Sequence, residues 1–237
     1  MRDFSWSGLD WRRRTRGEAW GPAYNRSWGA GNVSAPDARG DVTLRVTNPT
    51  GRSPVSAEMS TTRRGFGHGT YSMTVRKRLD VMQPELVWGG LFTYDPDAAP
   101  GFTEIDVCEA SAWGGGAQRE PVTQAHGYWF DATKAPGVGS SSVSFRAGTT
   151  EDVQTHRLVW EPARLTYATY AGEGFGGTLL KRTVMTGPTV PVPSRERLHV
   201  NIWVFGGGGG DPGRVRGDSV TIRDLRFTPA EAGVAAV

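Results

Sequence analysis

Short stretches of alternating apolar and polar residues, separated by glycine and proline, constrain this chain more than any other feature. Val42, Leu44 and Val46 alternate with polar residues, and the same period of two recurs over 69–79 and 197–205. This period places the apolar side chains on one face of a β-strand. The 33 glycines and 15 prolines, spread along the chain, disfavour long helices. The sequence therefore predicts an all-β protein.

The remaining strand patterns point to a particular architecture. Residues 156–162 and 164–172 predict two strands joined at Glu161–Pro162, and residues 218–227 predict a closing strand. Many strands with a turn every ten residues or so are typical of a β-sandwich of the jelly-roll kind. Since the chain contains no repeat and no long linker, we expect a single domain over residues 1–237.

Composition limits the partners of the chain. The formal net charge is +3, and the densest basic cluster is Trp11–Arg16. Nucleic-acid binding needs a concentrated basic face, whereas acidic residues are interspersed here, so we expect no nucleic-acid partner. No run of 18 apolar residues is present, so we expect no membrane span. The single cysteine, Cys108, excludes an intramolecular disulfide. We expect a monomer.

The segment "EIDVCE" places Glu104, Asp106 and Glu109 within one apparent strand. Glu104 and Asp106 share a face, and the apolar residues between them point into the core. Strict alternation would also bury Glu109, and an unpaired buried glutamate is costly. A β-bulge at Val107–Cys108 adds one residue and returns Glu109 to the face of the other two carboxylates. We therefore predict a bulge there.

Carboxylates gathered on one face suit glycoside hydrolysis. A retaining enzyme uses a nucleophile and a general acid about 5–5.5 Å apart, whereas an inverting enzyme holds the pair about 6.5–9.5 Å apart. Spacing along the backbone does not decide between the two. An aspartate between the glutamates can hold a proton and separate their pKa values.

Aromatic side chains provide a second indication of a glycan site. By alternation, residues 88–94 place Trp88 and Phe92 on one face, and residues 197–205 place polar and aromatic side chains opposite an apolar face. A single tryptophan in a β protein is more often in the core, but here the aromatic faces accompany the carboxylates. The predicted substrate-binding residues from this pattern are Trp88, Phe92, Trp113, Asn201 and Trp203, with Trp129 as a further candidate.

The segment "EIDVCE" resembles the bulged Glu-x-Asp-x-x-Glu signature of glycoside hydrolase family 16. The segments "VWGGLFTYD", "AHGYW", "HRLVWEPARLTYATYAG" and "LHVNIWVFGGGGGDPG" resemble other parts of that family in the same order, over most of Asp41–Phe227. The resemblance implies a concanavalin-like β-jelly-roll sandwich with a concave glycan-binding cleft.

The resemblance also implies roles for individual residues. Glu104 becomes the nucleophile, Asp106 its helper and Glu109 the general acid/base, while His126 is expected to hydrogen-bond near Asp106 or the sugar at subsite −1. We interpret His199 as structural or solvent-facing. No His/Asp spacing indicates a catalytic metal, and we expect no cofactor. Similar folds often carry a structural calcium, but this sequence does not identify its ligands.

These observations predict a retaining endo-acting glycoside hydrolase that cleaves a β-linked polysaccharide, either a laminarin-type β-1,3-glucan or a galactan. The alternatives are a catalytically inactive, lectin-like glycan-binding domain and a transglycosylase. Three like charges held together favour the enzyme. We expect an extracellular protein whose leader is absent from this sequence, with a cytoplasmic protein as the alternative.

Overall fold

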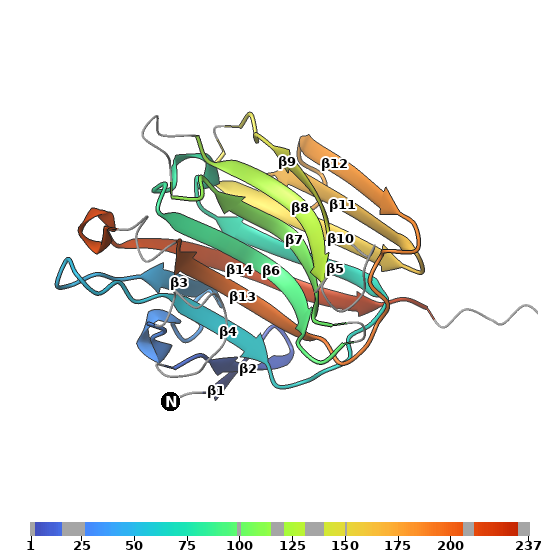
Figure 1. The fold of residues 1–237 in the computed structure, drawn as a ribbon, viewed down its shortest axis with the longest axis horizontal. Helices are drawn as coiled ribbons and strands as arrows, with labels where there is room; N and C mark the ends of the chain where they lie inside the picture. Colours follow the sequence, from blue (N-terminus) through green and yellow to red (C-terminus); the bar gives the residue numbers. More distant parts are fainter. Residues whose placement is uncertain are drawn as a thin grey trace, which may run out of the picture.

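The computed structural model describes residues 3–15, 27–98, 101–114, 121–130, 140–149, 151–205 and 211–231. Within these ranges the chain forms strands and three short 3-10 helices, and no α-helix. The strands make two antiparallel sheets that stack face to face (Figure 1). This confirms the predicted all-β jelly-roll sandwich.

The larger sheet has eight strands in the order β1-β2-β4-β13-β6-β7-β8-β9. Its members are β1 (Asp3–Trp6), β2 (Leu9–Arg13), β4 (Ala57–Thr61), β13 (Arg197–Val204), β6 (Leu86–Asp95), β7 (Thr103–Ser111), β8 (Thr123–Phe130) and β9 (Ser141–Phe145). The carboxylate segment forms β7, between β6 and β8.

The smaller sheet has six strands in the order β12-β11-β10-β5-β14-β3. Its members are β12 (Leu179–Thr186), β11 (Arg164–Ala171), β10 (Val153–Glu161), β5 (Gly69–Arg76), β14 (Asp218–Pro229) and β3 (Val42–Val46). The predicted hairpin at Glu161–Pro162 is confirmed, because β10 and β11 pair in register up to Glu161 and Arg164.

One hydrophobic core fills the space between the sheets. The larger sheet contributes Ile105 and Val107, and the smaller sheet contributes Tyr71 and Trp160, all buried. The alternating residues seen in the sequence supply these side chains, so the opposite face of the larger sheet remains for polar groups. That outer face carries the candidate site.

Candidate active site

A bulge in β7 brings the three carboxylates to one face. Asp106 pairs with Gly127 of β8 and Glu109 pairs with Ala125, so β7 has one more residue than its partner between these pairs. This confirms the predicted bulge at Val107–Cys108. Cys108 is fully buried, and its thiol contacts the side-chain oxygen of Gln124 at 3.5 Å.

The triad, defined as Glu104, Asp106 and Glu109, is electrostatically coupled. Asp106 is only 2% exposed, while the two glutamates are partly buried. Burial, and then the charge of Glu109, raise the pKa of Glu104 to about 8. Burial raises the pKa of Glu109 to about 7. Burial, followed by the charges of both glutamates, raises the pKa of Asp106 well above its ordinary value.

The three carboxyls titrate together, so the charge on one changes the pKa of the others. Asp106 shares a hydrogen bond with Glu104 that favours a proton on Asp106 and a negative charge on Glu104. Burial is the cause that raises the pKa of Glu109. Glu104, with a pKa of about 8, therefore holds its proton more tightly than Glu109, with a pKa of about 7, and the hydrogen bond from Asp106 acts in the opposite direction by favouring a negative charge on Glu104. The indole of Trp129 also donates a hydrogen bond to Asp106.

The triad lies in a cleft of about 440 Å³ on the outer face of the larger sheet. Aromatic and polar side chains from neighbouring strands surround it. The lining residues besides the triad are Arg14, Glu58, Gly89, Phe92, Tyr94, Phe102, His199, Asn201 and Trp203. The structure thus brings Phe92, Asn201 and Trp203 together with the triad, as the sequence predicted.

An aromatic cluster of Trp113, Trp203 and Phe205 adjoins one end of the cleft. The ring centroid of Trp113 lies 6.3 Å from that of Trp203 and 5.7 Å from that of Phe205, both in edge-on geometry. Trp113 is 47% exposed, whereas Trp203 is 8% exposed and packs on Trp28 and Val87. Trp113 therefore offers a free ring surface, while Trp203 also contributes to packing.

This difference predicts separate effects for the two tryptophans. Trp113→Ala should weaken oligosaccharide binding and lower the free energy of unfolding by only about 1 kcal/mol, because about half of the Trp113 side chain is already exposed. Trp203→Ala should cost about 2–4 kcal/mol of stability. Affinity electrophoresis and urea unfolding measure the two quantities. A large stability loss in Trp113→Ala would contradict its role as an exposed platform.

Two predicted substrate-binding residues point away from the cleft. His126 is fully buried between the sheets, where its ring nitrogens lie 3.0 Å from the hydroxyls of Thr183 and Thr169 and its ring stacks on Tyr167. The placement of His126 near Asp106 is therefore wrong. In β8 the neighbours Ala125 and Gly127 face the cleft, since they pair with Glu109 and Asp106.

Trp88 is the second correction. It is fully buried in the core between the sheets. Asn201 of β13 pairs with Gly90, but Ile202 pairs with Trp88, so β6 contains an extra residue at Gly89. This second bulge reverses the alternation upstream of Gly90, which is why Trp88 and Phe92 lie on opposite faces.

The bulges in β6 and β7 are adjacent. Gly90 has a φ of +60°, and a Cβ atom there would lie 2.2 Å from the carbonyl oxygen of Cys108. At Gly89 a Cβ would lie 2.1 Å from Oδ1 of Asn201. Gly90 is thus required for β6 to lie against the bulge in β7, whereas the absence of a side chain at Gly89 leaves room for the side chain of Asn201 in β13.

Replacing Gly90 by alanine should therefore destabilise the protein by at least about 2 kcal/mol, because positive φ and a backbone clash act together. Gly172→Ala is the matched control, since Gly172 has a φ of +81° but nothing within 4 Å of the added carbon. It should cost only about 1 kcal/mol. Thermal and urea unfolding give the comparison, and equal losses would show that the contact with Cys108 is unimportant.

A buried ionic chain that the sequence did not predict lies beside the triad. Glu58 of β4 accepts from Arg14 at 2.8 Å and lies 3.1 Å from Nδ1 of His199. Burial would raise the pKa of Glu58, but the hydrogen bond with His199 and the charge of Arg14 outweigh it and lower that pKa. His199 stacks on Phe92, with ring centroids 5.1 Å apart. It therefore belongs to the cleft floor.

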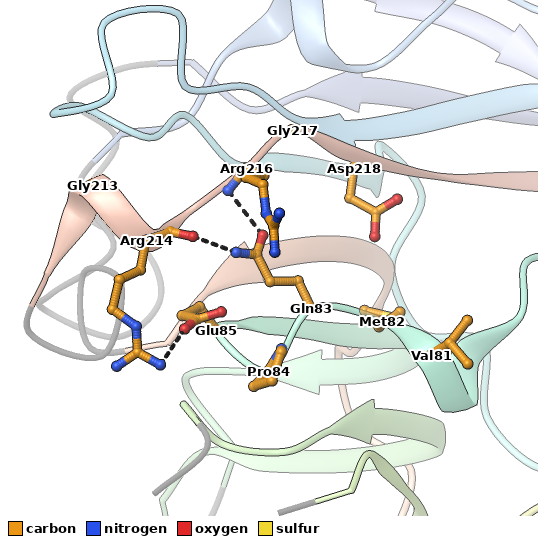
Figure 2. Close-up of a pocket in the computed structure, with 10 residues that line it drawn as sticks. All are labelled: Val81, Met82, Gln83, Pro84, Glu85, Gly213, Arg214, Arg216, Gly217 and Asp218. Carbon is orange, nitrogen blue, oxygen red and sulfur yellow. Dashed lines mark hydrogen bonds and ion pairs between the residues drawn. The ribbon is translucent and has the colours of Figure 1, made fainter. Parts of the chain in front are cut away.

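A wider cavity, of about 750 Å³, lies elsewhere, between the start of β6 and the start of β14 (Figure 2). Its polar groups bind one another. Gln83 bonds to the backbone of Arg214 and Arg216, and Arg214 pairs with Glu85 at 2.7 Å. This bonding joins the two strand ends, and no triad residue lines the cavity.

The described residues contain no group of three or more His, Cys, Asp or Glu side chains arranged to hold a metal ion. Within the same ranges, no helix has the length and apolarity needed to cross a lipid bilayer.

Solved structures with a similar fold are known, although sequence comparison finds no relative. No family model matches the chain, and no curated protein matches it. Among solved structures, the β-glucanase of Bacillus licheniformis aligns with a TM-score of 0.70 and 21% identity over 94% of each chain. A glycoside hydrolase family 16 endo-glucanase from Bacteroides ovatus aligns with a TM-score of 0.65 and 14% identity over 92% of this chain and 94% of the other.

A third similar structure is an immunostimulatory antigen and pseudo β-1,3-glucanase of Mycobacterium tuberculosis, with a TM-score of 0.64 and 17% identity over 93% of this chain and 91% of the other. The chain therefore has the β-jelly-roll fold of the family 16 glucanases. At identities of 14–21% the likeness establishes a shared fold, and a shared fold does not by itself establish a shared function.

Proposed function

We propose that the chain is a retaining, endo-acting glycoside hydrolase of the family 16 type that cleaves a β-linked polysaccharide. The observation that carries this proposal is the bulge in β7, which gathers Glu104, Asp106 and Glu109 on the floor of a cleft lined by aromatic side chains. A laminarin-type β-1,3-glucan or a galactan is the expected substrate, and secretion is the expected location.

In the first step, a carboxylate oxygen of Glu104 attacks the anomeric carbon. The bond to the leaving sugar breaks, and Glu109 donates its proton to the departing oxygen. In the second step, Glu109 removes a proton from water, which attacks the anomeric carbon and releases Glu104. Two inversions leave the configuration of the substrate unchanged.

Asp106 is a positioning residue in this scheme. Its hydrogen bond to Glu104 favours the ionised nucleophile, and the indole of Trp129 holds Asp106 in turn. Because Asp106 is buried, its proton stays with the triad. The attack needs a negative charge on Glu104, and the hydrogen bond from Asp106 favours that charge.

The second candidate function is that of an inactive glycan-binding domain. The observation that favours it is the structural likeness to a protein named a pseudo β-1,3-glucanase. Transglycosylation uses the same residues with a sugar in place of water. A reducing-sugar assay over laminarin, lichenan, agarose, carrageenan and a chitin-type polymer separates these functions. New reducing ends support the hydrolase, binding without turnover supports the glycan-binding domain, and longer oligosaccharides support the transglycosylase.

A further inference from the structure

A layer of buried polar side chains lies between the two sheets, behind the part of β7 that carries Glu109. The core between the sheets is otherwise mainly hydrophobic, so a polar group there needs a hydrogen-bond partner. Seven residues form this polar layer, and each is at most 7% exposed. They are Cys108, Gln124 and His126 from the larger sheet, and Gln154, His156, Thr169 and Thr183 from the smaller sheet.

The strand pairing places the polar layer at one member of the triad. Glu109 pairs with Ala125 of β8, and the neighbours of Ala125 in the chain are Gln124 and His126. Because alternate residues of a strand point to opposite faces, both neighbours point away from the cleft, and both are buried. Cys108, the residue before Glu109, is buried as well. Members of the polar layer therefore surround the inner side of the Glu109 backbone.

The support behind Glu104 is different. Ile105, the residue after Glu104, pairs with Tyr128 of β8, and both lie in the hydrophobic core. The smaller sheet changes in the same way, since the later inward residues of β10 are Leu158 and Trp160. Hydrophobic contacts are non-directional, whereas hydrogen bonds fix both distance and direction. Packing thus supports the nucleophile, and hydrogen bonds support the acid.

Two hydrogen-bonded links connect β8 to the smaller sheet, which lies behind it in Figure 1. Gln124 donates from Nε2 to Oε1 of Gln154 in β10, at 2.9 Å. Nε2 of His126 lies 3.0 Å from the hydroxyl of Thr169 in β11. These links flank the residue that pairs with Glu109, so they hold β8 against the smaller sheet on both sides of that pair.

Cys108 joins both links to β7. Its thiol lies 3.5 Å from Oε1 of Gln124 and forms a hydrogen bond with the hydroxyl of Thr169. The thiol also lies 3.5 Å from the backbone oxygen of Glu109. Burial raises the pKa of the thiol, so it stays protonated. Cys108 thus connects the polar layer directly to the backbone of Glu109.

The two histidines of the layer are neutral, and this fixes the direction of their hydrogen bonds. Burial lowers the pKa of both His126 and His156 to about 3. Nδ1 of His156 lies 3.1 Å from the hydroxyl of Thr169, and its Nε2 has no partner among the described residues. The single ring proton of His156 therefore belongs on Nδ1 and is donated to Thr169.

The hydroxyl of Thr169 then donates its own proton to Nε2 of His126. His126 in turn donates from Nδ1 to the hydroxyl of Thr183, at 3.0 Å. One hydroxyl, that of Thr169, therefore connects Cys108 in β7, His126 in β8 and His156 in β10.

We propose that the polar layer positions Glu109 for proton transfer, with Thr169 as the central positioning residue. Thr169 acts through Cys108 and His126 on the two paired strands, and it does not touch the substrate. Proton transfer requires hydrogen-bond distance between the acid and the leaving oxygen, so even a small displacement of Glu109 slows it. This inference rests on the proposed function, because Glu109 must be the general acid/base.

Thr169→Val removes the hydroxyl and tests the proposal on two substrates. Cleavage of the best polysaccharide needs the proton of Glu109, so kcat should fall about tenfold while KM stays unchanged. The first release of aryl alcohol from an activated aryl glycoside needs only Glu104, so its rate per folded enzyme should stay unchanged. Thr169→Ser, which retains the hydroxyl, should return kcat towards the native value.

Thr74→Val is the matched control. Thr74 is 7% exposed, and its hydroxyl lies 3.0 Å from that of Thr155. Both residues lie on the outer face of the smaller sheet, away from the polar layer. The control should therefore leave both rates unchanged.

A second variant covers the case in which Thr169→Val does not fold, since that substitution leaves buried imidazoles without a partner. The double variant Gln124→Leu/Gln154→Leu removes both partners of the other link, which costs less than removing one. It should show the same selective loss of polysaccharide cleavage.

The remaining outcomes overturn the proposal in distinguishable ways. An equal fall of both rates in the folded variants, or no fall in either, would show that the polar layer serves stability alone and would leave the proposed function intact. A rise in KM with unchanged kcat would show that the layer shapes the cleft and does not position the acid. A native protein that cleaves no polysaccharide and releases no aryl alcohol would remove the proposed function and this inference together.

Discussion

Glu104→Gln should lower hydrolysis of the best polysaccharide by at least about 10⁴-fold while the variant remains folded and binds the glycan, because the amide cannot attack the anomeric carbon. Glu151→Gln is the matched control, since Glu151 is an exposed glutamate outside the cleft. It should retain full activity. The same experiments on the native protein should give early products with the anomeric configuration of the substrate, measured by NMR.

The stability of Glu104→Gln provides an independent check. The folded-state pKa of Glu104, about 8, lies above the ordinary value of 4.5. The folded state therefore binds more protons than the unfolded state between these values, and the native protein loses stability as the pH rises through this window. Glutamine carries no such penalty. Because Glu104 retains some exposure, we expect the variant to be more stable by about 1–2 kcal/mol at pH 8 and equal below pH 4.

Two results would contradict the assignment. Near-normal turnover by Glu104→Gln would show that another group is the nucleophile. Product of inverted configuration would show that water attacks directly and that the glutamates act as an acid and a base about 6.5–9.5 Å apart.

Local rules predicted the strands and the first bulge. The alternation that predicted strands at 41–48, 69–79, 197–205 and 218–227 corresponds to β3, β5, β13 and β14. The bulge in β7 was predicted from an energetic argument, because burial of an unpaired Glu109 among apolar side chains would cost too much free energy. A sequence carries this information within a few residues, so it can be recognised without knowing which strands pair.

The errors came from the second bulge and from partners distant in sequence. The pair Gly89–Gly90 inside an apolar strand is itself a signal for a bulge, and it would have placed Trp88 in the core. Because Ala125 and Gly127 face the cleft, simple alternation in β8 places His126, which lies between them, on the opposite and buried face. Glu58 could not be found this way, because its partner His199 lies 141 residues further along the chain.

Glu109→Gln should abolish the alkaline limb of the pH–rate profile. The general acid must be protonated, and burial raises the pKa of Glu109 to about 7, so native activity should fall as the pH rises above about 7. Loss of the acid should slow cleavage of polysaccharide by about 10²–10⁴-fold. The falling limb should then disappear, because glutamine does not titrate in this range.

Substrates with different leaving groups distinguish a general acid from any other role of Glu109. An activated aryl glycoside departs without a proton, so Glu109→Gln should still form the covalent intermediate on Glu104 with this substrate. Release of the intermediate by water needs Glu109 as a base, whereas azide needs none. Added azide should therefore restore turnover of the aryl glycoside and yield a glycosyl azide of retained configuration.

Glu104→Gln is the contrasting variant, since without a nucleophile it forms no such intermediate and gives no retained azide product. Azide rescue of Glu109→Gln alone would assign the acid/base role to Glu109 and the nucleophile to Glu104. If activity on the aryl glycoside falls as far as activity on polysaccharide, and azide restores nothing, then Glu109 is not the acid, and the bulge in β7 serves the cleft in another way.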